Sequence, residues 1–171
     1  GSLATLLGAT LVGDRGREVT GVAIDSREVR PGDLFVALPG DRADGHDFLP
    51  HAATAGASAA LVSRPLPADV PLLMVPDTLA ALQRLARIER SESLYRLAAI
   101  TGSLGKTTTK EFAAALLATA FAVGTTRGSR NSQAGFPAEL CNQADGIAWM
   151  VAELGMSHDG FTAKAQRPLR G

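Results

Sequence analysis

Cysteine is almost absent from this sequence, since Cys141 is the only one among 171 residues. A single thiol excludes an internal disulfide and a cysteine metal site. With no secretion signal in view, it favours a reducing, cytoplasmic compartment. Long apolar runs are missing too: none approaches the roughly 18 residues of a membrane-spanning helix, so no membrane segment is expected.

Net charge is also absent, because 17 Lys and Arg residues balance 17 Asp and Glu residues. A neutral chain lacks the basic surface that nucleic acids and anionic membranes attract, so we expect neither as a partner. The composition, 46% hydrophobic and 20% charged, is ordinary for a soluble globular protein. The length suits one sizeable domain or two small ones, and we expect a monomer.

Residues 97–121 contain an apolar strand, a glycine loop and a helix in succession. Residues 97–100 form the expected strand, and residues 111–121 the expected helix. Glycines let a loop approach phosphates closely, and loop amides and a helix N-terminus attract anions. A lysine in such a loop reaches the β- and γ-phosphates, and a threonine hydroxyl ligates Mg²⁺. The predicted ATP site comprises Gly102, Ser103, Gly105, Lys106, Thr107 and Thr108.

This motif is a short form of the phosphate-binding loop. Ile100 stands where the full pattern has its first glycine, which leaves G-x-x-G-K-T. The alternative interpretation is a glycine-rich turn with a solvated lysine. The preceding strand and the following helix favour the phosphate site.

The remaining elements alternate between strands and helices, which is typical of an α/β protein. A polar stretch at residues 91–93 predicts a boundary between domains of residues 1–92 and 93–171. In the first domain we expect helices at residues 3–7, 48–55 and 77–90, and strands at 11–12, 19–24, 34–38, 59–62 and 72–75, with residues 13–16 as the turn between the first two strands.

In the second domain, strands at residues 97–100, 122–125 and 147–152 alternate with helices and predict a parallel sheet. Ligands of such sheets bind beyond the carboxyl ends of the strands. The glycine loop, the loop from Thr126 and residues 153–158 all follow strands, so we expect them to converge. Glu153 can hold Mg²⁺ opposite Thr107; the alternative is a solvated strand-end carboxylate. His158 belongs either to an active-site loop or to the plain surface.

Two polar loops follow strands of the first domain. Residues 25–27 and 41–46 contain arginines that can pair with a diphosphate, and Ser26 can donate to it. By themselves these are ordinary polar loops. The candidate binding residues are Asp25, Ser26, Arg27, Asp41, Arg42, Asp44, Gly45 and His46.

Long stretches of the sequence resemble the bacterial Mur ligases. Residues 25–38 (DSREVRPGDLFVAL) and 40–48 (GDRADGHDF) resemble their N-terminal domain, and residues 101–111 (TGSLGKTTTKE) resemble their ATP loop, in the same order. The resemblance implies a small UDP-binding α/β domain, followed by the first part of a P-loop-type ATPase domain with a parallel sheet.

Within the family, three features resemble the branch that adds D-alanyl-D-alanine (D-Ala-D-Ala) to UDP-N-acetylmuramoyl-tripeptide (UDP-MurNAc-tripeptide). They are the pair Lys110 and Glu111, residues 131–137 (NSQAGFP) and residues 153–160 (ELGMSHDG). The branch that adds the third peptide residue is the alternative within the family. A stand-alone UDP-sugar or nucleotide-binding module and a generic P-loop phosphotransferase are the alternatives outside it.

The resemblance implies a peptide-ligase reaction with ATP and Mg²⁺. ATP phosphorylates the carboxylate of the UDP-MurNAc-tripeptide, and the amine of D-Ala-D-Ala attacks the acyl-phosphate, releasing ADP and phosphate. The resemblance implies that Lys106 binds the β/γ-phosphates and that Thr107 and Glu153 bind Mg²⁺. It implies that Asn131 contacts the metal or the substrate, and that Ser157 and His158 line the sugar-peptide side. The UDP end is expected at the candidate binding residues of the first domain.

Two positions depart from the family pattern. Leu104 stands where a polar residue is usual in the ATP loop, and Ser132 replaces the second asparagine of the segment from Asn131. The family also continues past Gly171 with further strands, a histidine, a carbamylated lysine and a C-terminal domain. We therefore expect this chain alone to be inactive.

Overall fold

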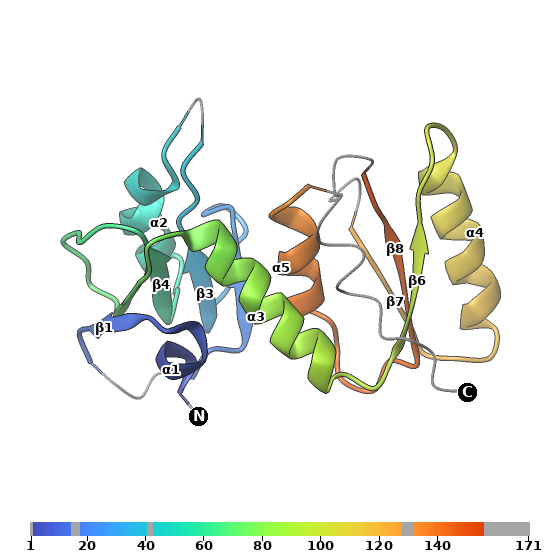
Figure 1. The fold of residues 1–171 in the computed structure, drawn as a ribbon, viewed down its shortest axis with the longest axis horizontal. Coiled ribbons are helices and arrows are strands. Elements are labelled where there is room, and N and C mark those ends of the chain that lie inside the picture. The colour runs from blue at the N-terminus through green and yellow to red at the C-terminus, as the bar shows by residue number, and fades with distance from the viewer. Residues whose placement is uncertain (1, 15–17, 41–42, 128–131, 156–171) are drawn as a thin grey trace. The chain divides into compact units, whose positions relative to one another are not determined.

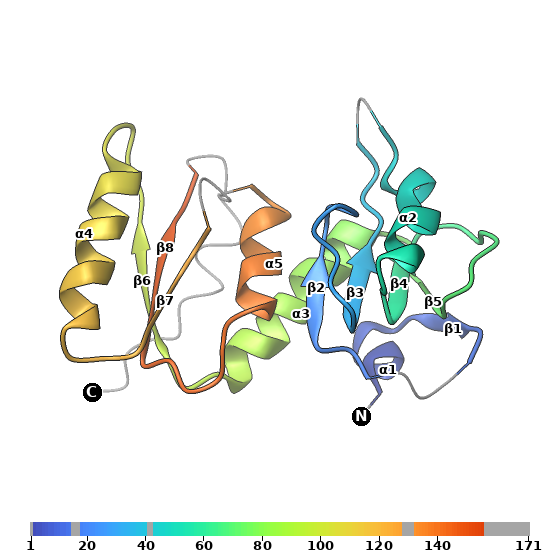
Figure 2. The same ribbon diagram turned by 180° about the vertical axis from the view of Figure 1, so that it is seen from behind.

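The computed structural model describes residues 2–14, 18–40, 43–127 and 132–155. The chain divides into two compact units, Gly1–Leu85 and Ala86–Gly171, which are described one at a time below (Figures 1 and 2). The division falls within helix α3 (Thr78–Glu92), whereas the expected boundary between residues 92 and 93 lies at the end of this helix. No helix in the described ranges is both long and apolar enough to cross a membrane.

The first unit is built on a five-stranded sheet in the order β1-β5-β4-β3-β2. Its strands are β1 (Thr10–Val12), β2 (Gly21–Ala23), β3 (Asp33–Val36), β4 (Ala59–Val62) and β5 (Leu72–Met74). Strands β2 to β5 are parallel, and β1 is antiparallel to β5. Strands β1 and β2 occupy opposite edges of the sheet and are not neighbours. The turn expected between them at residues 13–16 lies partly outside the described residues. The composition of a turn shows where the chain bends, but it does not show whether the strands on either side of the turn pair with each other.

Helices cover both faces of this sheet. Helix α1 (Leu3–Leu7) ends at Gly8, whose φ of 66° is left-handed. Helix α2 (Leu49–Thr54) follows a 3₁₀ turn, Gly45–Phe48, and packs on the row formed by Phe35, Ala60 and Leu72. The opposite row, Val36, Leu61 and Leu73, is equally buried, and α3 lies over that face (Figures 1 and 2). Burial on both faces explains why these strands are continuous apolar runs.

The second unit contains the predicted parallel sheet. Its strands are β6 (Arg96–Ile100), β7 (Val123–Thr125) and β8 (Trp149–Glu153), in the order β6-β8-β7. Helix α4 (Lys106–Ala118) begins at the lysine of the glycine loop, so the prediction that it starts at residue 111 is wrong. Three consecutive threonines are poor helix formers, but this turn is anchored by contacts of Thr107 and Lys110 with the ends of β8 and β7.

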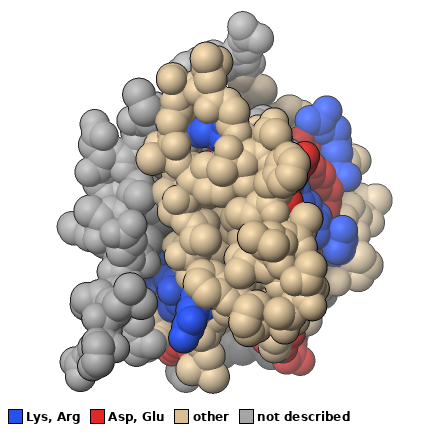
Figure 3. All heavy atoms as spheres, turned by 90° about the vertical axis from the view of Figure 1, so that its right-hand side faces the viewer, with Lys and Arg blue, Asp and Glu red and all other residues tan. Residues whose placement is uncertain are grey.

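Helices α4 and α5 (Gly135–Cys141) cover opposite faces of this sheet (Figures 1 and 2). Phe136 and Leu140 of α5 pack with Met150 and Ala152 of β8. Because side chains alternate along a strand, Val151 and Glu153 point to the other face, toward α4. The outer side of α4 exposes the large apolar side chains Phe112 and Leu116, and Figure 3 shows a broad, largely uncharged surface on this side.

Candidate nucleotide and metal site

The carboxyl ends of the three parallel strands in the second unit meet at one edge. Ile100, the last residue of β6, is in register with Glu153, the last residue of β8, and Thr125 of β7 is in register with Val151. The Leu154 amide donates to the Ile100 carbonyl 2.9 Å away. The glycine loop, the segment from Thr126 and the segment after Glu153 therefore begin side by side, as expected.

The glycine loop depends on two glycines with backbone angles that other residues rarely adopt. The φ angles are 146° at Gly102 and 72° at Gly105, and Gly105 caps the N-terminus of α4. Lys106 Nζ donates to the Gly102 carbonyl at 2.8 Å, so the ammonium group folds back over its own loop. Leu104 is 92% exposed. The Lys106 ammonium group, the loop amides and the N-terminus of α4 thus lie together, and groups of these kinds bind phosphate.

Thr107 and Glu153, the predicted Mg²⁺ ligands, are brought together although they are 46 residues apart. Thr107 Oγ1 in the first turn of α4 donates to Glu153 Oε2 at 2.8 Å, and Glu153 is only 4% exposed. Adjacent ligands of octahedral Mg²⁺, at about 2.1 Å from the metal, lie about 3.0 Å apart. Both oxygens therefore fit the coordination of one Mg²⁺. The described part of the chain contains no cluster of three or more His, Cys, Asp or Glu suited to a metal. A pair of protein oxygens supplemented by nucleotide phosphates and water is the arrangement that Mg²⁺ favours.

Lys110 and Thr126 join the same edge, and the sequence reasoning missed both roles. Lys110 Nζ donates to the Thr126 carbonyl at 2.9 Å, and Thr126 Oγ1 accepts from the Glu153 amide at 3.2 Å. Both residues are buried. In a helix that starts at Lys106, the three-residue spacing of Thr107 and Lys110 places both side chains on one face. That spacing is the sequence signal for their shared role.

Several predicted residues cannot be placed. Asp41, Arg42, Asn131, Ser157 and His158 lie outside the described residues. Ser132, the departure from the family's second asparagine, accepts a hydrogen bond from the Gly135 amide at 2.8 Å. Its hydroxyl therefore supports the start of α5.

In the first unit, polar residues gather where β2 and β3 end. Asp25 and Arg27 form a paired carboxylate and guanidinium, with Arg27 Nε 2.9 Å from Asp25 Oδ1. The hydrogen bond and the charge of Asp25 raise the pKa of Arg27 above its ordinary value. The Arg27 side chain is 81% exposed, whereas Ser26 beside it is buried. Arg27 is therefore accessible to an anionic ligand, and its orientation is held by Asp25.

The predicted loop after β3 packs tightly on the strand end. The Gly45 amide donates to the Leu38 carbonyl at 2.8 Å. A Cβ at Gly45 would lie 2.6 Å from the backbone nitrogen and oxygen of Leu38, so this approach requires glycine.

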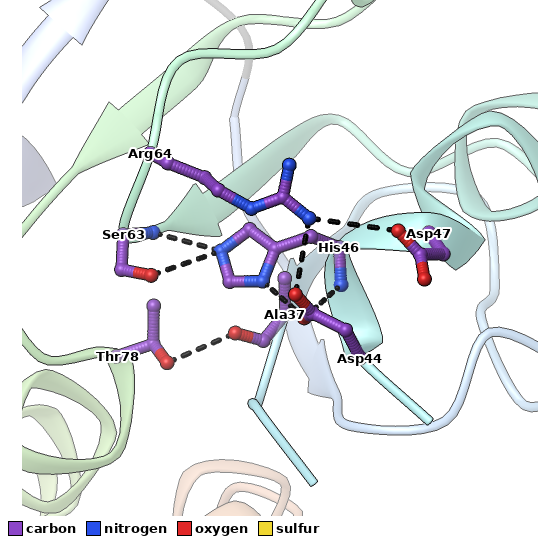
Figure 4. Close-up of polar contacts among 7 residues, drawn as sticks. All are labelled: Ala37, Asp44, His46, Asp47, Ser63, Arg64 and Thr78. Carbon is purple, nitrogen blue, oxygen red and sulfur yellow. Dashed lines mark hydrogen bonds and ion pairs between the residues drawn. The ribbon is translucent and has the colours of Figure 1, made fainter. Parts of the chain in front are cut away.

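His46 is the centre of a polar network in this loop (Figure 4). Its Nε2 accepts from the Ser63 amide at 2.9 Å and lies 3.2 Å from Ser63 Oγ. Since the Ser63 amide can only donate, Nε2 is the acceptor and Nδ1 carries the proton that it shares with Asp44 Oδ1, 2.6 Å away. Only 3% of His46 is exposed. The imidazole therefore faces inward and ties the loop after β3 to the turn after β4.

Arg64 extends this network to the surface. Its Nη2 lies 3.0 Å from Asp44 Oδ2 and 3.5 Å from Asp47 Oδ1. Hydrogen bonds from the His46 amide, the His46 ring and Arg64 hold the pKa of Asp44 well below its usual range. Ser63 and Arg64 follow β4 as the predicted residues follow β2 and β3, and this shared position is the pattern that could have identified them.

The first turn of α3 reaches the same edge. Thr78 Oγ1 donates to the Ala37 carbonyl at 2.9 Å, just after β3, and the Ala80 amide donates to Asp77 Oδ1 at 2.9 Å. Asp77 therefore caps the N-terminus of this helix.

These features define a class: an α/β chain with a phosphate-type loop at the carboxyl edge of a parallel sheet. Two protein-family models match this chain. They are described as "Mur ligase family, catalytic domain", which matches residues 18–90, and "Mur ligase middle domain", which matches residues 100–167. Among curated proteins, the UDP-N-acetylmuramoyl-tripeptide–D-alanyl-D-alanine ligase of Escherichia coli is 42% identical over 159 residues, covering 90% of this chain and 35% of that protein. The enzyme of the same name from Bacillus subtilis is 39% identical over 145 residues, covering 83% of this chain and 32% of that protein.

Solved structures agree. UDP-N-acetylmuramoylalanyl-D-glutamyl-2,6-diaminopimelate–D-alanyl-D-alanyl ligase from Acinetobacter baumannii matches with a TM-score of 0.82 and 32% identity, over 95% of this chain and 37% of that one. The MurF ligase from Thermotoga maritima, solved in complex with ADP, matches with a TM-score of 0.73 and 35% identity, over 85% of this chain and 34% of that one.

The chain belongs to the Mur ligase family. It spans about a third of the length of the curated relatives that it matches. The family assignment and the mixed α/β fold with parallel sheets expected from the resemblance are thereby confirmed.

Proposed function

We propose that this chain is part of an ATP-dependent ligase that adds D-Ala-D-Ala to UDP-MurNAc-tripeptide in peptidoglycan precursor synthesis. The observation that carries the proposal is the contact between Thr107 and Glu153 at the glycine loop. Relatives such as the Escherichia coli and Bacillus subtilis proteins, at 42% and 39% identity, are named for this activity. The nucleotide edge of the second unit would serve ATP, and the polar loops of the first unit would serve the UDP end of the substrate.

At the nucleotide edge, the loop amides of Gly102, Ser103 and Gly105 would surround the phosphates together with Thr108 in the first turn of α4. Lys106 would exchange the Gly102 carbonyl for a phosphate oxygen, which is a stronger acceptor because it is charged. Thr107 and Glu153 would hold Mg²⁺, which neutralises phosphate charge in reactions of this kind. These residues position and stabilise charge, and none is required to act as a nucleophile.

In the first unit, the exposed Arg27 would pair with a diphosphate, and the Ser26 hydroxyl would donate to it. Asp44 and Gly45 form the neighbouring loop, and His46 supports that loop from inside. Asp41 and Arg42 belong to the same loop in the sequence. We include Asn131, Ser157 and His158 in the proposal on the family resemblance alone.

The ligase that adds the third peptide residue is a weaker candidate. A structure of UDP-N-acetylmuramoyl-L-alanyl-D-glutamate–2,6-diaminopimelate ligase matches with a TM-score of 0.54 and 19% identity, a likeness that concerns the fold alone.

Two measurements test the proposal. Calorimetry of the 171-residue chain should detect binding of UDP-MurNAc-tripeptide that free UDP competes away and that uridine does not, because the diphosphate carries the charge that Arg27 would meet. Absence of any UDP-dependent binding would remove the assignment of the first unit.

The second measurement uses a protein extended to the length of the relatives. It should release ADP from ATP only when both UDP-MurNAc-tripeptide and D-Ala-D-Ala are present. ADP release that instead requires UDP-MurNAc-dipeptide and a free amino acid would favour the third-residue ligase.

A further inference from the structure

A buried lysine lies beside the candidate nucleotide site and has no role in the function proposed above. Lys110 is on α4, one helical turn after Thr107, and only 4% of it is exposed. Burying an ammonium group is costly unless hydrogen bonds and nearby charges compensate it. A methionine of similar length would fill the space without that cost, so the position of the Lys110 charge calls for a physical explanation.

The contacts of Lys110 lead directly to the predicted metal ligand. Lys110 Nζ donates to the Thr126 carbonyl at 2.9 Å, and the Thr126 hydroxyl accepts from the Glu153 amide at 3.2 Å. Glu153 Oε2 in turn accepts from Thr107 Oγ1 at 2.8 Å. Because Thr107 and Lys110 are on the same helix, these contacts close a ring that joins α4 to the ends of both β7 and β8.

Thr126 is the central member of this ring. It is 1% exposed, its amide donates to the Val151 carbonyl at 3.3 Å, and its carbonyl and hydroxyl are both engaged. Hydrogen bonds at its amide, carbonyl and hydroxyl hold both the backbone and the side chain of Thr126 in place. Thr126 therefore fixes the backbone from which the Glu153 side chain extends toward Thr107.

We propose that Lys110 is a positioning residue for Mg²⁺ binding, acting through Thr126 on Glu153. The inference rests on the proposed function of Thr107 and Glu153. Partners that orient a metal ligand without touching the metal typically change metal affinity by about 10- to 100-fold when removed.

The test measures ADP affinity of the 171-residue chain by calorimetry, once with Mg²⁺ and once with EDTA. In Lys110→Met, we expect the affinity with Mg²⁺ to fall about tenfold or more, and the affinity in EDTA to stay the same. The glycine loop and Lys106, which would hold the phosphates directly, are unchanged in this variant. A merely structural role would lower both affinities together. Lys110→Arg retains a charged donor and should recover part of the Mg²⁺-dependent affinity.

A second pair of variants protects the test against misfolding of Lys110→Met. Thr126→Val removes the hydroxyl that accepts the hydrogen bond from the Glu153 amide, and Thr126→Ser retains this hydroxyl. We expect the valine variant to lose Mg²⁺-dependent affinity and the serine variant to keep it. Glu111→Gln is the matched control, because this exposed neighbour on α4 also changes the charge by one and should have no effect.

Amide hydrogen exchange provides a readout that needs no nucleotide. The Glu153 amide should exchange faster in Lys110→Met and in Thr126→Val than in the parent chain, because its acceptor is displaced or removed. Unchanged exchange at Glu153 in both variants would overturn the inference, as would an unchanged ratio of the affinities with and without Mg²⁺. If the parent chain binds ADP no more tightly with Mg²⁺ than without it, the proposed metal role of Thr107 and Glu153 is wrong. The exchange measurement then still decides whether Lys110 positions Glu153.

Discussion

The substitution His46→Phe tests whether the polar network in Figure 4 supports the first unit from within. Phenylalanine occupies a similar volume but removes both ring nitrogens. The Ser63 amide, 2.9 Å from Nε2, then faces an aromatic ring with no acceptor. Leaving such a donor unsatisfied costs about 1–3 kcal/mol, and loss of the bond from Nδ1 to Asp44 adds to that cost.

For a unit of this size, each kcal/mol of lost stability lowers the melting temperature by about 4–8 °C. We therefore expect the first unit of His46→Phe to melt at least about 4 °C lower than that of the parent chain. His51→Phe is the matched control, because His51 is exposed on α2 and the same change there should shift stability by less than about 0.5 kcal/mol.

The two units can be followed separately, because the only tryptophan and the only tyrosine, Trp149 and Tyr95, are both in the second unit. Fluorescence of these residues reports on the second unit, and far-ultraviolet circular dichroism reports on both. The effect of His46→Phe should appear in the circular dichroism transition, and the fluorescence transition should stay at the temperature seen in the parent chain. A melting temperature equal to that of His51→Phe would refute the role given to the ring nitrogens.

Four further outcomes are expected. Arg27→Ala should weaken UDP binding about tenfold, because a charge-assisted contact to the diphosphate is lost, and an unchanged calorimetric affinity would place the diphosphate elsewhere. Lys106→Ala should abolish Mg·ATP binding and leave UDP binding intact; loss of both would contradict separate sites in the two units. Because the folded-state pKa of Asp44 is depressed, its contribution to stability is present at neutral pH and is lost as the pH falls below about 4. In Asp44→Asn the melting temperature of the first unit should therefore change less between pH 6 and pH 3 than it does in the parent chain. The 171-residue chain should not release ADP in response to D-Ala-D-Ala, and its amides after Ser93 should exchange faster than those of the first unit; dipeptide-dependent turnover would overturn the first expectation and uniform exchange the second.

The sequence alone was enough for the elements and the chemistry that depend on neighbouring residues. The apolar run before Gly102, the two glycines and Lys106 follow one another directly, so the strand and the loop could be recognised locally. The same holds for the cap at Asp77 and for the turn after α2, where Gly56 has a φ of 100°. The pairing of Thr107 with Glu153 was also predictable, because both lie at ends of elements in a parallel sheet, and such ends meet at one edge.

Tertiary structure decided what depends on partners distant in the sequence. Strand β1 pairs with β5, and no local pattern distinguishes that partner from β2. Helix α4 extends back to Lys106 because Thr107 and Lys110 find partners at the ends of β8 and β7, and these contacts outweigh the poor helix propensity of three threonines. His46 looked like a binding residue in a polar loop, and only the folded chain shows its ring turned inward to Ser63. A side chain's role depends on which groups surround it, and the sequence order does not contain that information when those groups come from another strand.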